Sequence, residues 1–547
     1  MGSDSPILVV GGRTTGLMMA GELARHGCPV RLIDQSPGID PHSRATYIHS
    51  RTLEIFEGLG LADEIVAKGQ PLKRVNIYAN GKLMASSPEL PVDSTFPFGA
   101  AFAQNKTEAI LERHVRDLGV MVERNTSLLD LEQRDSEVIA TLRSPDGSNE
   151  TISTPWLIGC DGAHSVTRKL IKESFPGEID PIPYLGADVI IDGPMDDDVV
   201  YLCMHDQGDV FLFLLDEGRR QIVATLPKHS ERQHPPTLEE MQQIVDERGF
   251  TDLRLSDPRW LTTYRIHYRL VPRYRNGRVF LAGDAAHVHS VFEGQGMNTG
   301  MQDAHNLAWK LALVVKGIAP EWWLDTYPSE RRRIAEDILE WTKAVTEHFT
   351  LFEELSQEER ERVYANQVLP EHERIQIRTH EEQLDLDYRS SHLCEPELEI
   401  EPDSDECPRP GARAPDVSGL ICVGKETSFL QLAGLPRHRL LLFRPEDAKA
   451  RTQIDDVVIQ MNTRHRHWVE VAIVASGEQD RQVPEGVSLI EDPQGRLRKK
   501  YGGDRYPIYL IRPDGYLSVR TDRPEKLEEF LARILHEDRP EFSPEDQ

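Results

Sequence analysis

An apolar segment, a glycine-rich turn and an amphipathic helix open the chain, and this order constrains the fold more than any other feature. Residues 6–10 predict a buried strand, residues 11–16 a turn and residues 17–26 a helix with its apolar residues on one face. A second strand is predicted at residues 30–34. Two strands joined by a crossover helix form a parallel β-α-β unit, and Asp34 at the end of the second strand is placed to bind the ribose hydroxyls of an adenosine. The sequence therefore predicts an α/β domain that binds a dinucleotide.

The turn departs from the usual dinucleotide pattern, G-x-G-x-x-G, at its middle glycine. Arg13 occupies that position, where a glycine lets the backbone approach the pyrophosphate. Its side chain could fill the volume of the phosphates, and it would strain the backbone if the position needs a positive φ. Alternatively, the guanidinium could turn outward and pair with the phosphates as a cation. The turn residues predicted to contact the dinucleotide are Gly11, Gly12, Arg13, Thr15 and Gly16.

A second glycine-rich segment joins a predicted strand at residues 277–282 to a predicted helix at residues 302–312. Gly283 and Asp284 follow the strand directly. An aspartate at that place can accept hydrogen bonds from ribose or ribityl hydroxyls, and backbone N–H groups at a helix start can face a phosphate or an electron-rich ring edge. The further candidate contacts in this segment are Gly294, Gly296, Met297 and Asn298.

A third segment runs Asp161-Gly162-Ala163-His164-Ser165, with Arg168 following. Together, the three segments resemble in order and spacing, over residues 5–320, the class A flavoprotein monooxygenases, the aromatic hydroxylases related to phenol hydroxylase and para-hydroxybenzoate hydroxylase. The resemblance implies FAD as cofactor, NAD(P)H as electron donor, and O2 and an aromatic or polyketide-like small molecule as substrates. It implies hydroxylation through a flavin C4a-hydroperoxide, so that the flavin carries the chemistry and no catalytic side chain is assigned. The additional FAD contacts that it implies are Arg44, Gln104, Asp161 and Gly162.

Two departures from the family leave a second hypothesis open. Besides Arg13, Glu293 stands where relatives carry a glycine, in a loop that would face the flavin ring, and Phe292 would narrow the cavity there. A relative with weakened or lost flavin binding would fit both departures, and it would carry out a non-redox step such as isomerisation or cyclisation, or bind a small molecule. A flavin enzyme that inactivates an antibiotic by hydroxylation would leave the same motifs as the first hypothesis.

The rest of the chain divides by pattern. Residues 1–177 and 271–394 form the Rossmann-like FAD-binding domain, and residues 178–270 show alternating short strands typical of an inserted antiparallel sheet, which in the family forms a wall of the substrate pocket. Residues 395–408 are an acidic linker with prolines. Residues 409–547 resemble the thioredoxin-like C-terminal domain of the phenol hydroxylase branch, without a Cys-x-x-Cys pair for thiol chemistry. The candidate substrate-binding residues are Tyr201, Phe211, Phe213 and Phe292.

Composition excludes several classes of partner. The formal net charge of −28 argues against nucleic acid and against an anionic membrane surface. No apolar run reaches the roughly 18 residues that a membrane helix needs. The six cysteines are scattered, with neither a paired nor a metal-ligand spacing, which indicates a reducing compartment and predicts no metal site. We therefore expect a cytoplasmic enzyme, and a homodimer remains open.

Overall fold

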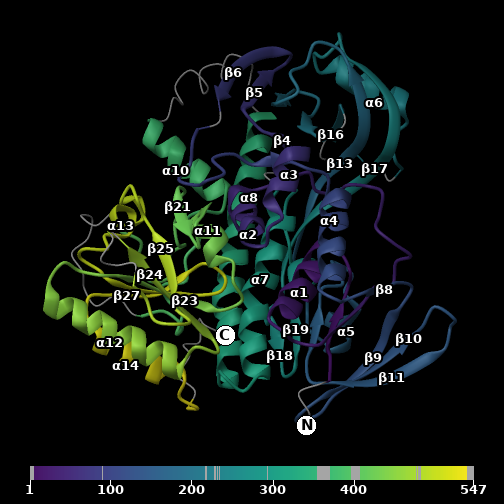
Figure 1. Ribbon diagram of the computed structural model, residues 1–547. Coiled ribbons are helices and arrows are strands. Elements are labelled where there is room, and N and C mark those ends of the chain that lie inside the picture. Colours follow the sequence, from purple (N-terminus) through teal and green to yellow (C-terminus); the bar gives the residue numbers. More distant parts are fainter. Residues whose placement is uncertain are drawn as a thin grey trace.

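The computed structural model describes most of the chain, in three sheet-based parts arranged around a long central helix (Figure 1). The described residues are 5–88, 90–215, 218–226, 230, 232, 234–291, 294–353, 370–395, 407–475, 477 and 482–538.

The first sheet is the predicted Rossmann-like sheet. Its central strands are parallel and come from distant parts of the chain, and all four residues of the innermost strand, β1, are buried because both sheet faces are covered. The carboxyl ends of β1, β2, β12 and β19 therefore meet at one edge, which brings the three predicted motifs together. In sheet order the strands are β18 (Arg275–Asn276), β19 (Val279–Leu281), β12 (Leu157–Gly159), β1 (Ile7–Val10), β2 (Val30–Ile33) and β8 (Val122–Glu123).

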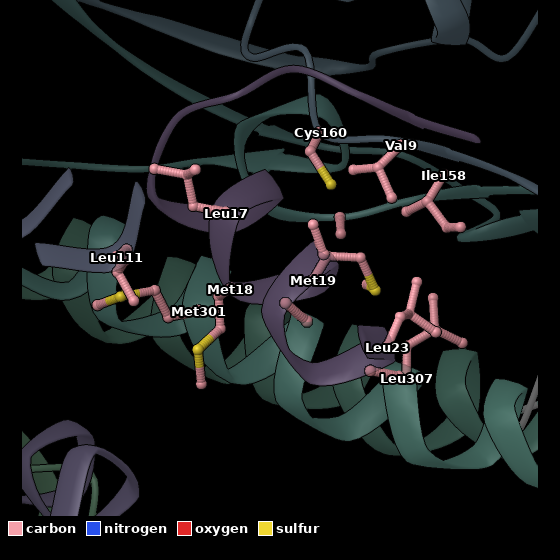
Figure 2. Close-up of a cluster of buried hydrophobic side chains, with 14 of the residues drawn as sticks. Val9, Leu17, Met18, Met19, Leu23, Leu111, Ile158, Cys160, Met301 and Leu307 are labelled. Carbon is pink, nitrogen blue, oxygen red and sulfur yellow. The ribbon is translucent and has the colours of Figure 1, made fainter. Parts of the chain in front are cut away.

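Helices cover one face of this sheet and a small antiparallel sheet covers the other. The helices are α1 (Thr14–Arg25), α4 (Gln104–Asp117) and α7 (Gln295–Val315), and the small sheet consists of β9 (Ser127–Gln133), β10 (Val138–Arg143) and β11 (Asn149–Thr154). Figure 2 shows α1 packed against α7 through apolar side chains, and all residues of α1 from 16 to 23 are buried because the helix lies between α7 and the sheet. The side chains at this contact include Leu17, Met18, Met19, Leu23, Met301 and Leu307.

The second sheet has eight strands and extends beyond the predicted range of residues 178–270. Strand β14 pairs in parallel with β5, and β5 forms a hairpin with β6, so two strands from the N-terminal part of the chain complete one edge. Helix α6 (Leu238–Glu247) covers one face. In sheet order the strands are β20 (His287–Val288), β17 (Arg254–Leu270), β13 (Gly177–Asp192), β16 (Arg219–Thr225), β15 (Val210–Leu214), β14 (Val199–Met204), β5 (Arg74–Ala79) and β6 (Lys82–Pro88).

The C-terminal part is built on a seven-stranded mixed sheet. Strands β23 and β24 are parallel and are joined by α12 (Ala448–Arg464), while β26 and β27 form an antiparallel pair followed by α14 (Pro524–Ile534). The thioredoxin-like comparison stays a prediction, and most of the predicted linker, residues 396–406, lies outside the described residues. In sheet order the strands are β22 (Lys425–Thr427), β21 (Leu420–Cys422), β25 (Ser488–Glu491), β24 (Val469–Ala475), β23 (His438–Phe443), β26 (Ile508–Ile511) and β27 (Leu517–Thr521).

Shorter elements complete the described structure. A three-stranded sheet places β7 between β3 and β4. These elements are β3 (Tyr47–Ile48), β4 (Gln70–Pro71), β7 (Ala100–Ala101), α2 (Ser50–Gly58), α3 (Ala62–Lys68), α5 (Val166–Leu170), α8 (Thr326–Glu353), α10 (Glu371–Glu381), α11 (Phe429–Ala433), α13 (Arg496–Tyr501) and the 3₁₀ helices η1 (Gly283–Ala285) and η3 (Glu321–Asp325).

The C-terminal part docks on the far side of α7 through a tryptophan cluster and a buried ionic network. Trp309 of α7 and Trp323 of η3 pack edge-to-face against each other, and both also contact His438 of β23. Beside them, both oxygens of the Glu330 carboxylate accept hydrogen bonds from Arg512 at 2.8 Å, and Lys310 donates to the same carboxylate at 2.7 Å. All three charged side chains are at most 1% exposed, so Lys310 depends on Glu330 for compensation, while Arg512 pairs with both Glu330 and the buried Asp514.

We expect Glu330→Gln to lower the free energy of unfolding by about 3 kcal/mol, because it leaves the buried cation Lys310 without its anion and leaves Arg512 with Asp514 alone. The measurement is urea unfolding followed by near-ultraviolet circular dichroism. The matched control is Glu321→Gln, which removes an ion pair with Arg275 whose glutamate side chain is 53% exposed. This change should cost about 0–1 kcal/mol. Equal effects of the two substitutions would contradict the proposed dependence on buried charge.

Candidate functional site

Two glycines of the N-terminal turn are required by close backbone contacts. Gly11 has φ +107°, and a Cβ atom there would lie 2.3 Å from the carbonyl oxygen of Cys160; a Cβ atom on Gly16 would lie 1.7 Å from the carbonyl oxygen of Gly11. The N–H of Gly12 donates to Oδ2 of Asp34 at 2.5 Å, which ties the turn to the end of β2. The turn therefore leaves the N-terminus of α1 at the carboxyl edge of the sheet, where helix dipole and free N–H groups favour an anion.

Arg13 lies in this turn without backbone strain. Its φ of −98° and ψ of −169° are those of extended backbone, so the alternative in which it forces an unfavourable positive φ is wrong. Its side chain turns outward, and one guanidinium nitrogen lies 2.8 Å from Oδ2 of Asp40. The arginine therefore leaves the turn in the conformation that a dinucleotide-binding helix needs.

Arg44 and Gln104 lie beside the same turn, as predicted for cofactor contacts. Arg44 is 64% exposed and its guanidinium lies 3.5 Å from Oδ2 of Asp40, the carboxylate that also binds Arg13. Gln104 is the first residue of α4; its backbone N–H donates to Ser43 at 2.9 Å, and its side-chain amide donates to Glu108 at 2.9 Å. Two cations and an amide thus surround the start of α1.

The carboxylate of Asp161 is occupied within its own segment. It accepts hydrogen bonds from the backbone N–H groups of Val166 and Thr167, at 2.8 and 2.9 Å, and so caps the N-terminus of α5, while Gly162 turns the chain at φ +77°. Arg168, which follows, donates to the carbonyl oxygen of Ala285 at 2.8 Å. This segment therefore positions the backbone next to Asp284 instead of presenting its own carboxylate as a free ligand.

Asp284 has the surroundings expected of a ligand-binding carboxylate. Its side chain is exposed to water and accepts no hydrogen bond from the part of the chain that the structure describes. Protein atoms nevertheless surround the carboxyl group, and this burial raises its pKa above the ordinary value, although His287 and Arg44 oppose the rise. The carboxyl group of Asp284 is therefore available to a ligand.

Asp303 of α7 holds the strand end that carries Asp284, and sequence reasoning missed it. This fully buried carboxylate accepts hydrogen bonds from the N–H of Gly283 at 3.0 Å, from Nε2 of His287 at 2.7 Å and from Nε of Arg331 at 2.8 Å. Burial acts to raise the pKa of Asp303, but His287 and Arg331 outweigh it and the pKa lies below its usual value. The sequence did contain a signal for Asp303, because polar residues interrupt the otherwise apolar pattern of the predicted helix around it.

The start of α7 is fixed by Gly294 and Asn298. Gly294 has φ +66°, and a Cβ atom there would lie 2.9 Å from Cβ of Tyr47. The amide of Asn298 donates to the carbonyl oxygens of Gly294 and Tyr47 and accepts from the N–H of His49, so the first turn of α7 is bound to β3. Gly296 lies between them, and Met297 packs in the core. Phe292 and Glu293 lie outside the described residues.

The predicted substrate-binding aromatics do not share one sheet face. Phe211 and Phe213 lie on the face away from α6, with Tyr184 and Tyr264. Tyr201 lies on the opposite face, in the core beneath α6, stacked on Tyr78. The expectation that all three line a common pocket is therefore wrong, because neighbouring strands in register put Tyr201 opposite Leu212 and not opposite a phenylalanine.

The described residues contain no helix with the length and apolar character needed to span a bilayer. Within the same residues, no group of three or more His, Cys, Asp or Glu side chains is placed to hold a metal ion.

Comparisons with known proteins agree with this geometry. Residues 4–342 match the family described as "FAD binding domain". The chain is 32% identical to a 6-methylpretetramide 4-monooxygenase of Streptomyces rimosus over 95% of this chain and 92% of that protein, and 31% identical to a flavin-dependent monooxygenase of Mycobacteroides abscessus over 97% and 100%. The solved ternary complex of aklavinone-11 hydroxylase with FAD and aklavinone has a TM-score of 0.76 at 25% identity, covering 98% of this chain and 99% of that one.

We expect Asp303→Asn to lower the free energy of unfolding by about 3 kcal/mol, because Arg331 is left as a buried cation without an anion. It should also lower the flavin retained per polypeptide after desalting, since the amide has one acceptor oxygen and cannot serve both Arg331 and the pair formed by Gly283 and His287. Thermal unfolding and flavin absorbance measure the two effects. The control is Asp504→Asn, whose ion pair with Arg498 involves an 85% exposed aspartate and should change neither quantity. Wild-type stability and flavin content in Asp303→Asn would contradict the assigned role.

Proposed function

Since the chain belongs to the FAD binding domain family, we infer that it is an FAD-dependent monooxygenase that takes electrons from NAD(P)H and inserts one oxygen atom of O2 into an aromatic, polyketide-like small molecule. The observation that carries this inference is the convergence of the N-terminal turn and the segment of Asp284 at one edge of the parallel sheet, around an exposed carboxylate. Relatives that match over nearly their whole length are named monooxygenases.

The residues at this edge fit FAD. The start of α1 offers the anion-binding N–H groups for the pyrophosphate, and Asp34 offers a carboxylate for the adenosine ribose. Although Asp34 accepts hydrogen bonds from the N–H of Gly12 and from both the N–H and the hydroxyl of Ser36, a carboxylate has about four acceptor sites and keeps capacity for one ribose hydroxyl. Asp284 would bind the ribityl chain, and the first turn of α7 would face the flavin ring with its free N–H groups.

Bound FAD supplies the redox chemistry, by accepting hydride from NAD(P)H and activating O2. The chain's own residues bind, orient and exclude water. Asn298 and Asp303 hold the two segments that would flank the ring, and the eight-stranded sheet would cover the reacting substrate. The rival hypothesis of a flavin-free relative loses one of its two supports, because Arg13 adopts ordinary extended backbone.

The substrate would lie between the FAD-binding part and the face of the eight-stranded sheet that carries Phe213. On this face, Phe213, Leu202 and Tyr264 are half-buried and Gln221 donates to the carbonyl oxygen of Ser43, which brings the face against the cofactor-binding part. Flat apolar and aromatic side chains suit a fused aromatic ring system. We propose that the reaction takes place in the cytoplasm, since all six cysteines are free thiols.

The function is tested by adding FAD to the purified chain and following NADPH and NADH oxidation in air, with 6-methylpretetramide and aklavinone as aromatic polyketide probes. We expect flavin binding, oxidation stimulated by at least one probe, and a product heavier by one oxygen atom that carries label from ¹⁸O2. Binding of FAD with no stimulated oxidation and no labelled product from a wider panel of phenols and polyketides would overturn the monooxygenase assignment.

The sheet faces give a matched test of substrate binding. Phe213→Ala should raise KM for the accepted probe about tenfold, equivalent to about 1.4 kcal/mol, because it removes an aromatic wall of the proposed pocket. Tyr78→Ala removes another half-buried aromatic ring of the same sheet, but on the face covered by α6, and should leave KM unchanged. The measurement is the steady-state KM of both variants. An equal change in KM for the two would contradict the assignment of Phe213 to the substrate pocket.

A further inference from the structure

Three charged side chains meet beside the N-terminus of α1. Asp40 binds Arg13 at 2.8 Å, and Arg44 approaches the same oxygen to 3.5 Å. The other oxygen of Asp40 accepts from the ring nitrogen of His42 at 2.9 Å and from its backbone N–H at 3.1 Å. The cluster therefore contains one carboxylate between two permanent cations, and it lies where the fold places the pyrophosphate of a dinucleotide.

Arg13 is the member that a typical dinucleotide turn lacks. It is the residue directly before α1, and its backbone carbonyl oxygen accepts the first hydrogen bond of that helix, from Leu17, at 2.8 Å. Its side chain remains 37% exposed, so the guanidinium keeps donors that Asp40 does not use. A cation fixed at this point lies within reach of the same anion that the helix N-terminus attracts.

Asp40 competes with a bound pyrophosphate for the guanidinium of Arg13. The Arg13 guanidinium and the hydrogen bonds from His42 outweigh burial and hold the pKa of Asp40 at about 2, so it is a carboxylate at neutral pH. A pyrophosphate at the start of α1 would be repelled by Asp40 and attracted by Arg13 and Arg44. Glu108, which is buried nearby and bound to Gln104, adds to the negative charge that Arg13 has to offset.

We propose that Arg13 is an FAD-binding side chain of this protein. In the absence of FAD, Asp40 holds the Arg13 guanidinium at the edge of the site. In an exchange of anionic partners, the FAD pyrophosphate then replaces Asp40 as the partner of this guanidinium. The proposal rests on the inferred flavin function. In the usual dinucleotide turn, the middle glycine lets the backbone approach the pyrophosphate. Here the Arg13 side chain would make part of the contact with the pyrophosphate, and a contact between charged groups makes FAD affinity sensitive to ionic strength.

The exchange also accounts for the position of Arg44. With Asp40 shared between two guanidinium groups, release of Arg13 leaves Arg44 as the remaining cation beside that carboxylate. Asp40 therefore does not become an uncompensated charge next to the phosphates. The ring of His42 packs at a tilt against that of Trp260 of β17, with 6.0 Å between the ring centroids, so the loop that carries Asp40 contacts the eight-stranded sheet.

The test measures FAD dissociation constants of the apoprotein by flavin fluorescence quenching. Arg13→Gln should raise the Kd about tenfold and flatten its dependence on salt, and Arg13→Lys should restore part of the affinity. Asp40→Asn should lower the Kd about threefold, and this gain should shrink in the Arg13→Gln background because Asp40 then no longer competes with the pyrophosphate for Arg13. Riboflavin, which has no pyrophosphate, should bind equally to wild type and Arg13→Gln.

Arg31→Gln is the matched control. Arg31 lies on β2 of the same sheet and pairs with Glu123 and Glu150, at 2.8 and 2.7 Å, so its loss removes an equivalent ionic contact and should leave the Kd for FAD unchanged. Circular dichroism confirms that each variant is folded. An Arg13→Gln protein that binds FAD as tightly as wild type, or more tightly, would overturn the proposed role of Arg13 while leaving the flavin function intact. A wild-type protein that binds no FAD would overturn both.

Discussion

The buried carboxylate of Asp303 is the interaction on which the arrangement of the site depends. It lies on α7 and joins three segments that are distant in sequence: the strand end at Gly283, the imidazole of His287 and the guanidinium of Arg331 on α8. An unpaired carboxylate at full burial would cost several kcal/mol, so the three donors must be present together for the fold to be stable. The position of Asp284, and with it the proposed cofactor contact, follows from this one anchor.

The same helix organises the other parts of the molecule by the same means. Asn298 binds β3, Gln302 donates to Gln383 at 2.5 Å, and Lys310 binds Glu330 in the network that reaches Arg512. Each polar group is buried and each has a partner on a different segment. A helix of this kind specifies where its neighbours lie, because an apolar contact tolerates sliding and a buried hydrogen bond does not. The apolar side chains of α7 pack against α1 and contribute buried apolar surface. The polar side chains of α7 fix the positions of the neighbouring segments along the helix.

Much of the architecture could be predicted from local patterns. The β-α-β unit and the strand before Gly283 follow from apolar periodicity and glycine placement, and the structure has them within a few residues. The helix after Gly283 is also predicted, but it begins at Gln295 and not at residue 302, because its first two turns are not apolar in pattern. Asp303 and Glu330 could not be predicted, because their donors come from segments whose approach depends on the completed fold. The same reason explains β5, which joins the eight-stranded sheet from about 120 residues earlier in the chain than its partner β14, and Tyr201, whose face is set by register and not by residue type.

The ionic network between Glu330, Lys310 and Arg512 has a consequence for how such proteins can diverge. Two partners come from the helices of the FAD-binding part and one from the C-terminal sheet. Loss of Arg512 leaves the buried Asp514 without its cation, and loss of Glu330 leaves Lys310 without its anion, so the charges on the two parts have to match. The C-terminal third is therefore not an exchangeable module. A chimera that grafts this region from another protein would have to carry over the matching charges.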